Sequence, residues 1–96
     1  MTAYILATLD ITDSAKFARY RELVIPLIAQ FQGLTVVNTE DVTVREGRPT
    51  RRRVIMVRFP DAILANAFLD CDAYRPLLRL RLEASAGEVV IVDSLI

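Results

Sequence analysis

Three short stretches of the chain are apolar at consecutive positions. Val54–Val57 and Val89–Val92 are unbroken apolar runs, and Tyr4–Ala7 is nearly so. A half-exposed strand would alternate apolar and polar residues, because successive side chains point to opposite faces of a sheet. The pattern therefore predicts strands that are covered on both faces.

A longer segment has helical periodicity instead. Asp13 is a suitable N-cap for it, because a carboxylate can accept hydrogen bonds from the first free amides. Pro26 should kink this helix or divide it into two pieces, and Gly33 should end it. The apolar residues that fall on one arc at about 100° per residue are Phe17, Tyr20, Leu23, Val24, Leu27, Ile28 and Phe31.

Turn and capping residues divide the rest of the chain. Gly47–Thr50 has turn composition, so the extended segments on either side of it should form a hairpin. Residues 38–41 interrupt the first of these segments, which indicates a bulge or an irregular edge strand. Asp61 and Asp72 are suitable caps for two further helices, and Gly87 should end the second. The predicted elements are a strand over 3–10, a helix over 14–31, an extended segment over 34–45, a strand over 52–59, helices over 62–70 and 73–86, and a strand over 88–93.

This order, β-α-β-β-α-β with a broken second helix, predicts an α+β fold of the ferredoxin-like type, with residues 1–96 as a single domain. Such a fold has a four-stranded antiparallel sheet with helices on one face only. We expect a second copy of the chain to cover the other face, so that two protomers form a dimeric α+β barrel. The alternative is a monomer whose edge strands merely have an apolar composition. The central position expected for Val54–Val57 argues against that alternative.

Charge and rare residues exclude several functions. Twelve Lys and Arg residues balance twelve Asp and Glu residues, so we expect no nucleic-acid partner and no attraction to a membrane. Histidine is absent, which removes histidine-based acid–base chemistry, a histidine-ligated haem and the commonest zinc and copper sites. The chain has one cysteine, no signal-peptide pattern and no apolar run of membrane-spanning length. We therefore expect a cytoplasmic protein without a metal or a cofactor.

Arg81 is out of place on its helix. It projects near the middle of the apolar arc of residues 73–86, close to Tyr74, whereas Arg75 and Arg79 lie on the opposite side. A guanidinium in apolar surroundings needs a carboxylate, several carbonyls or an anionic ligand. Two interpretations stay open at this point: a structural arginine that forms an ion pair or reaches the rim, and an arginine that binds a ligand.

Tyr20 and Tyr74 also lie on core-facing arcs of their helices. Their hydroxyls need partners, so the two residues either line a cleft between helices and sheet or are core residues whose hydroxyls reach its edge. Together with Arg81 they are the predicted ligand site. Asp10 and Glu46 end predicted strands; they are candidates for pairing with Arg81 or for a catalytic base, or are ordinary solvated carboxylates.

Two further features indicate no separate site. Arg51–Arg53 form the main charge cluster, but no aromatic residues are interleaved with them. A solvated hairpin base, or pairing with acidic residues of the neighbouring strand (Glu40, Asp41 and Glu46), is therefore preferred to phosphate binding. Cys71 is flanked by two aspartates, which disfavour a reactive thiolate, and one thiol with two carboxylates is not a zinc site.

The segment Phe59–Ala62 and the helix that carries Tyr74 and Arg81 resemble a bacterial family known as domain of unknown function thirteen-thirty. The resemblance covers nearly the whole chain, although Phe68 and Leu34 stand where the family has a tryptophan and a second glycine. The family is similar to the dimeric α+β barrel superfamily, which includes cofactor-free monooxygenases, lactone isomerases, haem enzymes and proteins of no known activity. The other matching positions are Ala3–Tyr4, Asp13, Phe17, Tyr20, Pro26, Gly33, Glu46–Gly47, Arg53 and Asp72–Ala73.

Two functions follow as hypotheses. In the first, the domain binds or transforms a small anionic or carbonyl metabolite without a cofactor. Arg81 would hold the negative charge and the tyrosines Tyr20 and Tyr74 would orient the ligand. Glu46 or Asp10 would move a proton. In the second, the chain is a noncatalytic dimerisation or stress-response module whose Arg81 is a structural ion pair. Whether Arg81 reaches a cavity or meets a protein carboxylate discriminates between them.

Overall fold

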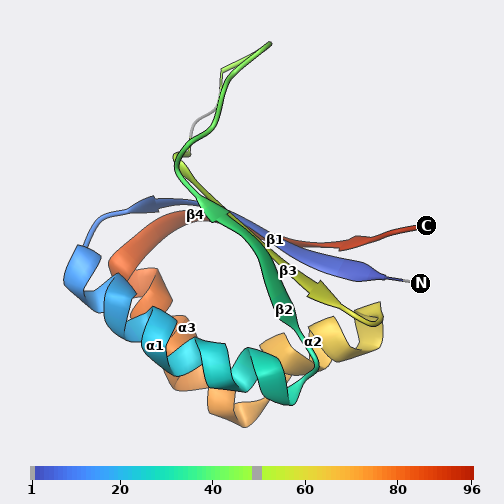
Figure 1. The fold of residues 1–96 in the computed structure, drawn as a ribbon. Helices are drawn as coiled ribbons and strands as arrows, with labels where there is room; N and C mark the ends of the chain where they lie inside the picture. Colours follow the sequence, from blue (N-terminus) through green and yellow to red (C-terminus); the bar gives the residue numbers. More distant parts are fainter. Residues whose placement is uncertain (1, 49–50) are drawn as a thin grey trace.

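The computed structural model describes residues 2–48 and 51–96, which form four strands, three α-helices and a short 3₁₀-helix. The ends of the chain lie side by side, where the backbone N–H of Ser94 donates to the carbonyl of Thr2 (2.9 Å; Figure 1). In chain order the elements are β1 (Ala3–Ile11), α1 (Ser14–Gln30), β2 (Leu34–Thr39), β3 (Arg53–Phe59), α2 (Ala62–Asp70), η1 (Asp72–Tyr74), α3 (Arg75–Ala84) and β4 (Ser85–Asp93).

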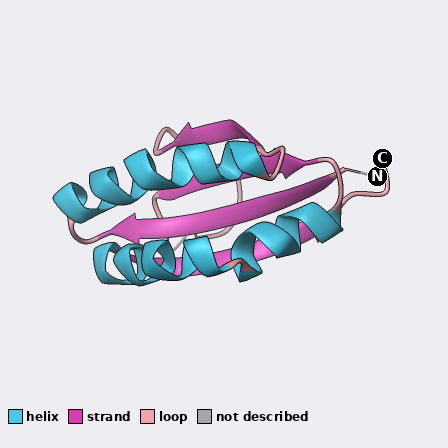
Figure 2. Cartoon of the chain, turned by 90° about the horizontal axis from the view of Figure 1, so that it is seen from below, coloured by secondary structure: helices cyan, strands magenta, loops and turns pink. Residues whose placement is uncertain are grey.

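The sheet has the order β2-β3-β1-β4, and every neighbouring pair of strands is antiparallel. The helices all pack against one face of this sheet (Figures 1 and 2). The predicted break in the second helical segment falls at Cys71, whose backbone is extended (ψ 152°). These features confirm the ferredoxin-like α+β arrangement that the order of elements predicted.

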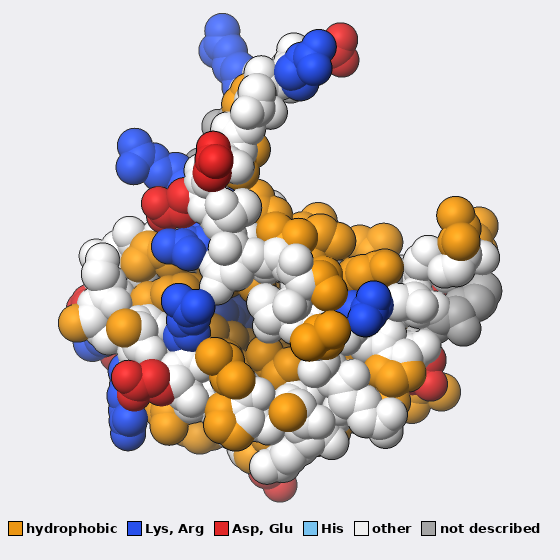
Figure 3. Space-filling view, viewed as in Figure 1, with side chains coloured by type: hydrophobic (Ala, Val, Ile, Leu, Met, Phe, Trp, Pro, Cys, Tyr) orange, Lys and Arg blue, Asp and Glu red, His pale blue; other side chains and the backbone are white. Residues whose placement is uncertain are grey.

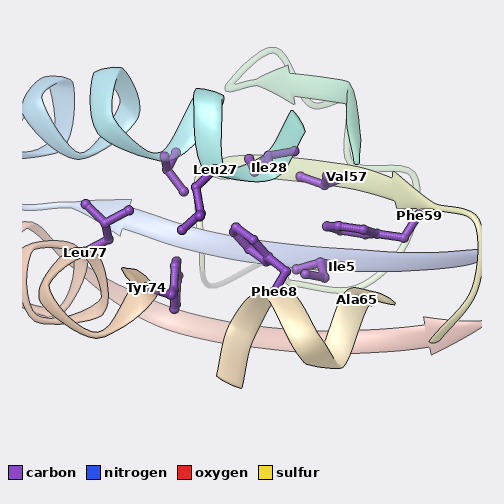
Figure 4. Packing of buried hydrophobic residues seen from close by; sticks show 10 residues of the cluster. Ile5, Leu27, Ile28, Val57, Phe59, Ala65, Phe68, Tyr74 and Leu77 are labelled. Atoms are coloured by element: carbon purple, nitrogen blue, oxygen red, sulfur yellow. The ribbon is translucent and has the colours of Figure 1, made fainter. Parts of the chain in front are cut away.

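The hydrophobic core lies between this face of the sheet and the helices. Phe68 of α2 is its centre, with ring centroids 5.7 Å from Phe59 and 4.9 Å from Tyr74 (Figure 4). Such tilted aromatic pairs add to the stabilisation that burial of the rings already provides. The core residues of β1 alternate along the strand, as a sheet with one face toward the helices requires: Ala3, Ile5, Ala7 and Leu9.

The opposite face of the sheet is covered by no helix of the described part of the chain. Val90 and Val92 remain 47% and 44% exposed on it. Figure 3 shows hydrophobic side chains along the upper side of the molecule, where the sheet faces away from the helices. We call this surface the open face. Its central residues are Tyr4, Leu6 and Thr8 of β1, Val54 and Met56 of β3, and Val90 and Val92 of β4.

α1 begins where the sequence predicted. The Asp13 side chain accepts a hydrogen bond from the backbone N–H of Lys16 (3.0 Å). Pro26 does not divide the helix, because α1 continues through it to Gln30. Buried residues on both sides of the proline, among them Val24 and Leu27, hold both turns against the sheet and compensate for the missing backbone donor.

The end of α1 is a Schellman turn, and its left-handed residue is Gln32 (φ 64°) rather than a glycine. The N–H of Gly33 donates to the carbonyl of Ile28 (2.9 Å), and that of Gln32 donates to the carbonyl of Ala29 (3.0 Å). Gly33 is needed for close packing rather than for a left-handed backbone, because a Cβ there would lie 2.7 Å from the Ile28 side chain and 2.8 Å from the Phe59 ring.

The predicted helix over 73–86 is too long, and the prediction that Gly87 ends it is wrong. α3 ends at Ala84 because the backbone N–H groups of Thr12 and Asp13 donate to its carbonyl (2.8 and 3.1 Å), and the chain then pairs with β1 from the next residue on. Gly87 lies inside β4 with φ 154°, where a Cβ would collide with the carbonyl oxygen of Thr8. Close approach of two strands requires glycine there.

β2 ends at Thr39, and residues 40–48 form an extended arm that leaves the sheet on the side away from the helices (Figure 1). The register shift of this edge strand lies at Thr35–Val37, so the prediction of an irregularity at 38–41 is displaced by a few residues. β2 and β3 pair as the predicted hairpin requires, while its turn at Gly47–Thr50 lies partly outside the described residues. Among the helices of residues 2–48 and 51–96, none has the length and hydrophobicity needed to cross a bilayer.

Candidate functional site

A cavity of about 180 Å³ lies between the sheet and the helices. Its wall is mostly aliphatic and aromatic; Figure 4 shows part of it, with Phe68 and Tyr74 on the helical side and Ile5 and Val57 on the sheet. Within the described residues, no carboxylate, thiol or imidazole lines it. The polar side chains that reach the cavity are those of Tyr20, Arg21, Thr35, Asn38, Tyr74 and Arg81.

Three of these polar groups form one connected cluster. The Nε of Arg81 donates to the hydroxyl of Tyr74 (3.3 Å), and the hydroxyls of Tyr74 and Tyr20 lie 3.1 Å apart. Tyr74 is in η1 and Arg81 follows seven residues later on α3, so two helical turns place them on the same side. Tyr20 comes from α1, which packs against α3. We call these three residues the donor cluster.

One phenolic O–H of the donor cluster has no acceptor within the cluster. Tyr74 accepts from Arg81, and a single O–H joins the two phenols. If Tyr74 is the donor to Tyr20, the Tyr20 proton is uncommitted; if Tyr20 donates, the Tyr74 proton is uncommitted. In both arrangements the cluster can donate one further hydrogen bond from a phenol.

Neither phenol-to-phenol arrangement makes Tyr20 a base. Burial raises the pKa of Tyr20 far above its ordinary value, and the neighbouring Tyr74 raises it further, against a smaller opposite effect of Arg81. The Tyr20 phenol therefore keeps its proton at neutral pH, and it acts as a hydrogen-bond donor or acceptor only.

The charge of Arg81 has no carboxylate partner among the described residues. Of the ion pairs formed by residues 2–48 and 51–96, none involves Arg81. Its backbone carbonyl accepts from the Ser85 hydroxyl (2.7 Å), which fastens the last turn of α3. The side chain thus lines the cavity with a hydrogen bond to one phenol and no carboxylate partner among the described residues.

Asp10 lies on the other side of the sheet from the cavity. The wall contributed by β1 consists of alternate residues from Ile5 to Leu9, so Asp10 projects from the open face. Its carboxylate accepts from the Arg51 guanidinium (2.9 Å) and from the backbone N–H of Arg52 (3.3 Å). The hydrogen bond from Arg51 lowers the pKa of Asp10, with desolvation opposing it, so this carboxylate is ionised and occupied.

Glu46 lies in the arm, on a shallow hollow lined by other arm residues. The structure therefore brings together Tyr20, Tyr74 and Arg81 of the predicted site residues, and places both Asp10 and Glu46 elsewhere.

Three polar residues of the cavity wall, Arg21, Thr35 and Asn38, were not among the predicted site residues. Asn38 of β2 lines the cavity, and its side-chain oxygen accepts from the Arg53 guanidinium (2.9 Å). An amide within an apolar strand is a signal that sequence analysis could have used. Arg21 of α1 carries no such signal, because it is one of several charged residues on an exposed helical face.

Two arginines of the cluster near the hairpin form ion pairs with carboxylates. The guanidinium of Arg53 forms an ion pair with the Glu40 carboxylate (3.6 Å), as predicted from the neighbouring acidic residues. The guanidinium of Arg51 forms ion pairs with the carboxylates of Asp10 and Glu88 (2.9 and 3.6 Å). The thiol of Cys71 donates to the carbonyl of Phe68 (3.3 Å). No group of potential metal ligands occurs in the part of the chain that the structure describes.

Comparison with known proteins gives one family and several related folds. Residues 2–95 match the family described as Domain of unknown function (DUF1330). No curated protein has a significant sequence match to the chain.

Solved structures with the same fold include RPA0582 from Rhodopseudomonas palustris, a protein of unknown function, with 13% identity and a TM-score of 0.79 over 99% of this chain and 83% of that one. They also include SnoaB, a cofactor-independent oxygenase from Streptomyces nogalater, with 13% identity and a TM-score of 0.68 over 97% and 92% of the chains. An antibiotic biosynthesis monooxygenase has 17% identity and a TM-score of 0.54 over 100% of both chains. At these identities the likeness shows the fold alone.

Proposed function

Since the chain belongs to the DUF1330 family, a domain of unknown function, we propose its function from its own cavity. The domain binds a small molecule that presents an anionic or carbonyl oxygen to the donor cluster, and it does so without a cofactor. The apolar remainder of the wall contacts the body of that molecule.

The observation that carries this proposal is the unneutralised guanidinium of Arg81 in a largely apolar cavity. Arg81 is half-buried, and a partly desolvated cation without a counter-charge is unfavourable, whereas a hydrogen bond to a charged group contributes about 1.5–3 kcal/mol. A ligand carboxylate or enolate would supply the missing charge. The alternative function, a noncatalytic module with Arg81 in a structural ion pair, lacks that pair among the described residues.

Transformation of the bound molecule is the second candidate function. Hydrogen-bond donors fixed around one point stabilise negative charge that develops on an oxygen, as in an enolate. SnoaB, which has the same fold, is a cofactor-independent oxygenase. We infer, however, that neither Asp10 nor Glu46 of the same protomer is the base, because neither lines the cavity. Catalysis would thus depend on a substrate that is already acidic.

The most direct test compares two arginines of α3. Small carboxylic acids and ketones are screened by thermal shift, and positives are titrated by calorimetry against the wild type, Arg81→Met and Arg79→Met. Arg79 is exposed, so it serves as the matched control. We expect Arg81→Met to weaken binding by about tenfold or more and Arg79→Met to leave it unchanged. A screen in which no acid or ketone raises the melting temperature would refute the binding function.

The same variant tests the structural alternative. Removing one partner of a buried ion pair typically costs about 3–5 kcal/mol, because the other charge is left unpaired. Arg81 forms no such pair among the described residues, so we expect Arg81→Met to lower the free energy of unfolding by much less. A loss within that range would support the structural module.

We also propose that the working unit is a cytoplasmic homodimer in which two open faces pack together. The apolar residues at the centre of this face support the proposal, since a contiguous exposed apolar surface marks an interface. Val90→Glu places a charge on the open face, whereas Leu82→Glu changes an exposed leucine of α3 that is 61% accessible. Sedimentation at micromolar concentration should show a dimer for the wild type and Leu82→Glu, and a smaller species for Val90→Glu. A wild type that sediments as a 10.8 kDa monomer would contradict the dimer.

A further inference from the structure

The size of the cavity and the chemistry of its polar groups define the class of molecule that fits it. This inference rests on the proposed function, and it adds which ligand body and which functional group the site selects.

The cavity volume limits the ligand body to about one ring. A largely apolar cavity of about 150 Å³ accommodates benzene in a protein interior. The present cavity, about 180 Å³, is filled by a six-membered ring and one small substituent, and a second fused ring would have to extend through its opening. Its wall includes the rings of Phe68 and Tyr74 and the branched side chains of Ile55 and Val89, which suit a flat apolar body.

The polar groups around the cavity are mainly donors. Arg81 has only donor hydrogens, and the donor cluster has one uncommitted phenolic proton. The side-chain oxygen of Asn38 accepts from Arg53, and the same amide group carries two donor hydrogens. Arg21, an exposed residue of α1, also lines the cavity. Among the lining side chains that the structure describes, the acceptors are hydroxyl oxygens and the Asn38 oxygen, and no carboxylate is present to receive a ligand N–H.

We propose that the cavity selects single-ring molecules bearing one acidic or other acceptor group, with monocyclic aromatic carboxylates as the simplest members of the class. The carboxylate lies against Arg81 and the free phenolic proton, and the ring lies against the apolar wall. Cationic amines of the same shape are rejected, because the site has the Arg81 guanidinium and, among the described residues, no carboxylate to receive them.

Four probes of matched shape test this specificity: benzoate, toluene, benzylamine and 2-naphthoate. Affinities are measured by calorimetry at neutral pH, where benzoate is ionised and benzylamine is protonated. We expect benzoate to bind about tenfold or more tightly than toluene, benzylamine not to bind, and naphthoate to bind more weakly than benzoate. Toluene or benzylamine equalling benzoate would overturn the charge selection, and naphthoate equalling benzoate would overturn the size limit.

Two variants locate the effect in the cavity. Arg81→Met should abolish the advantage of benzoate over toluene while toluene binding persists. Ala7→Val adds bulk to the wall and should weaken benzoate and toluene together; circular dichroism checks that it folds. If Ala7→Val changes neither affinity, the probes bind elsewhere and the inference fails. If none of the four probes binds but another acid from the screen does, this inference fails and the proposed function stands; if nothing binds, both fail.

Discussion

Replacing Tyr74 with phenylalanine removes one oxygen atom and leaves the buried ring in place. That oxygen is the centre of the donor cluster: it accepts from Arg81 Nε at 3.3 Å and lies 3.1 Å from the Tyr20 hydroxyl. Tyr74 is only 3% exposed, so the loss is poorly compensated by water. A bond to a charged donor contributes about 1.5–3 kcal/mol and a neutral one about 0.5–1.5 kcal/mol.

Both distances are long for their donors, which favours the lower half of each range. We therefore expect Tyr74→Phe to lower the free energy of unfolding by about 2 kcal/mol. Tyr20→Phe should cost less, about 1 kcal/mol, because the bond that joins its hydroxyl to Tyr74 is between neutral groups.

Urea denaturation of the wild type, both single variants and the double variant completes a double-mutant cycle. Protein concentration is held constant, since dimer formation would make stability depend on it. The coupling between Tyr20 and Tyr74 should be about 0.5–1 kcal/mol. A coupling of zero, or a Tyr20→Phe variant that loses as much stability as Tyr74→Phe, would refute this account of the donor cluster.

Three further predictions concern the strands and two titrating groups. Gly87→Ala should lower the free energy of unfolding by about 2–4 kcal/mol, because the added Cβ collides with the backbone of β1. Gly47→Ala should lower it by about 1 kcal/mol, since Gly47 has a positive φ but open space around it. Equal losses in urea denaturation would contradict the collision at Gly87. The Arg51 hydrogen bond lowers the pKa of Asp10, so the stability that it contributes is present above the ordinary carboxyl pKa and lost as pH falls through the lowered one. The stability difference between wild type and Asp10→Asn should accordingly shrink in acid, and a difference that persists there would count against it. Burial raises the pKa of Tyr20, so its contribution is complete below about pH 10 and is lost as pH rises further. Chemical denaturation at alkaline pH should show a smaller loss for Tyr20→Phe than for the wild type, and identical profiles would exclude the effect.

Much of the fold could be predicted from the sequence, because helix caps are local contacts and core-facing positions recur at regular spacing. The apolar arc of α1 follows from the spacing of residues along a helix. The caps Asp13 and Asp61 each depend on a hydrogen bond within one helical turn. The end of α3 depends on a contact between distant parts of the chain, because the carbonyl of Ala84 accepts hydrogen bonds from the residues that follow β1. Gly87 looks like a helix terminator in sequence, and only strand pairing shows that it makes room for β1.

The candidate site could be predicted in part for a similar reason. Arg81 was recognisable because a charge in an apolar arc violates helical patterning. Asp10 could have been separated from the cavity by strand parity, since the core-facing residues of β1 alternate from Ile5 to Leu9. The spacing of residues along the chain does not show that Asn38 faces the helices. Its position depends on the register of β2 against β3, which shifts between Thr35 and Val37.

The strand order has a consequence for how the molecule holds together. The arm separates an N-terminal half-chain with β1, α1 and β2 from a C-terminal half-chain with β3, the remaining helices and β4. In the order β2-β3-β1-β4, every hydrogen-bonded neighbour of a strand belongs to the other half-chain. Neither fragment has two adjacent strands of its own, and the donor cluster takes Tyr20 from one and Tyr74 and Arg81 from the other. A protease cut in the arm should therefore leave two fragments that remain associated and folded, while each fragment expressed alone should fail to form a sheet.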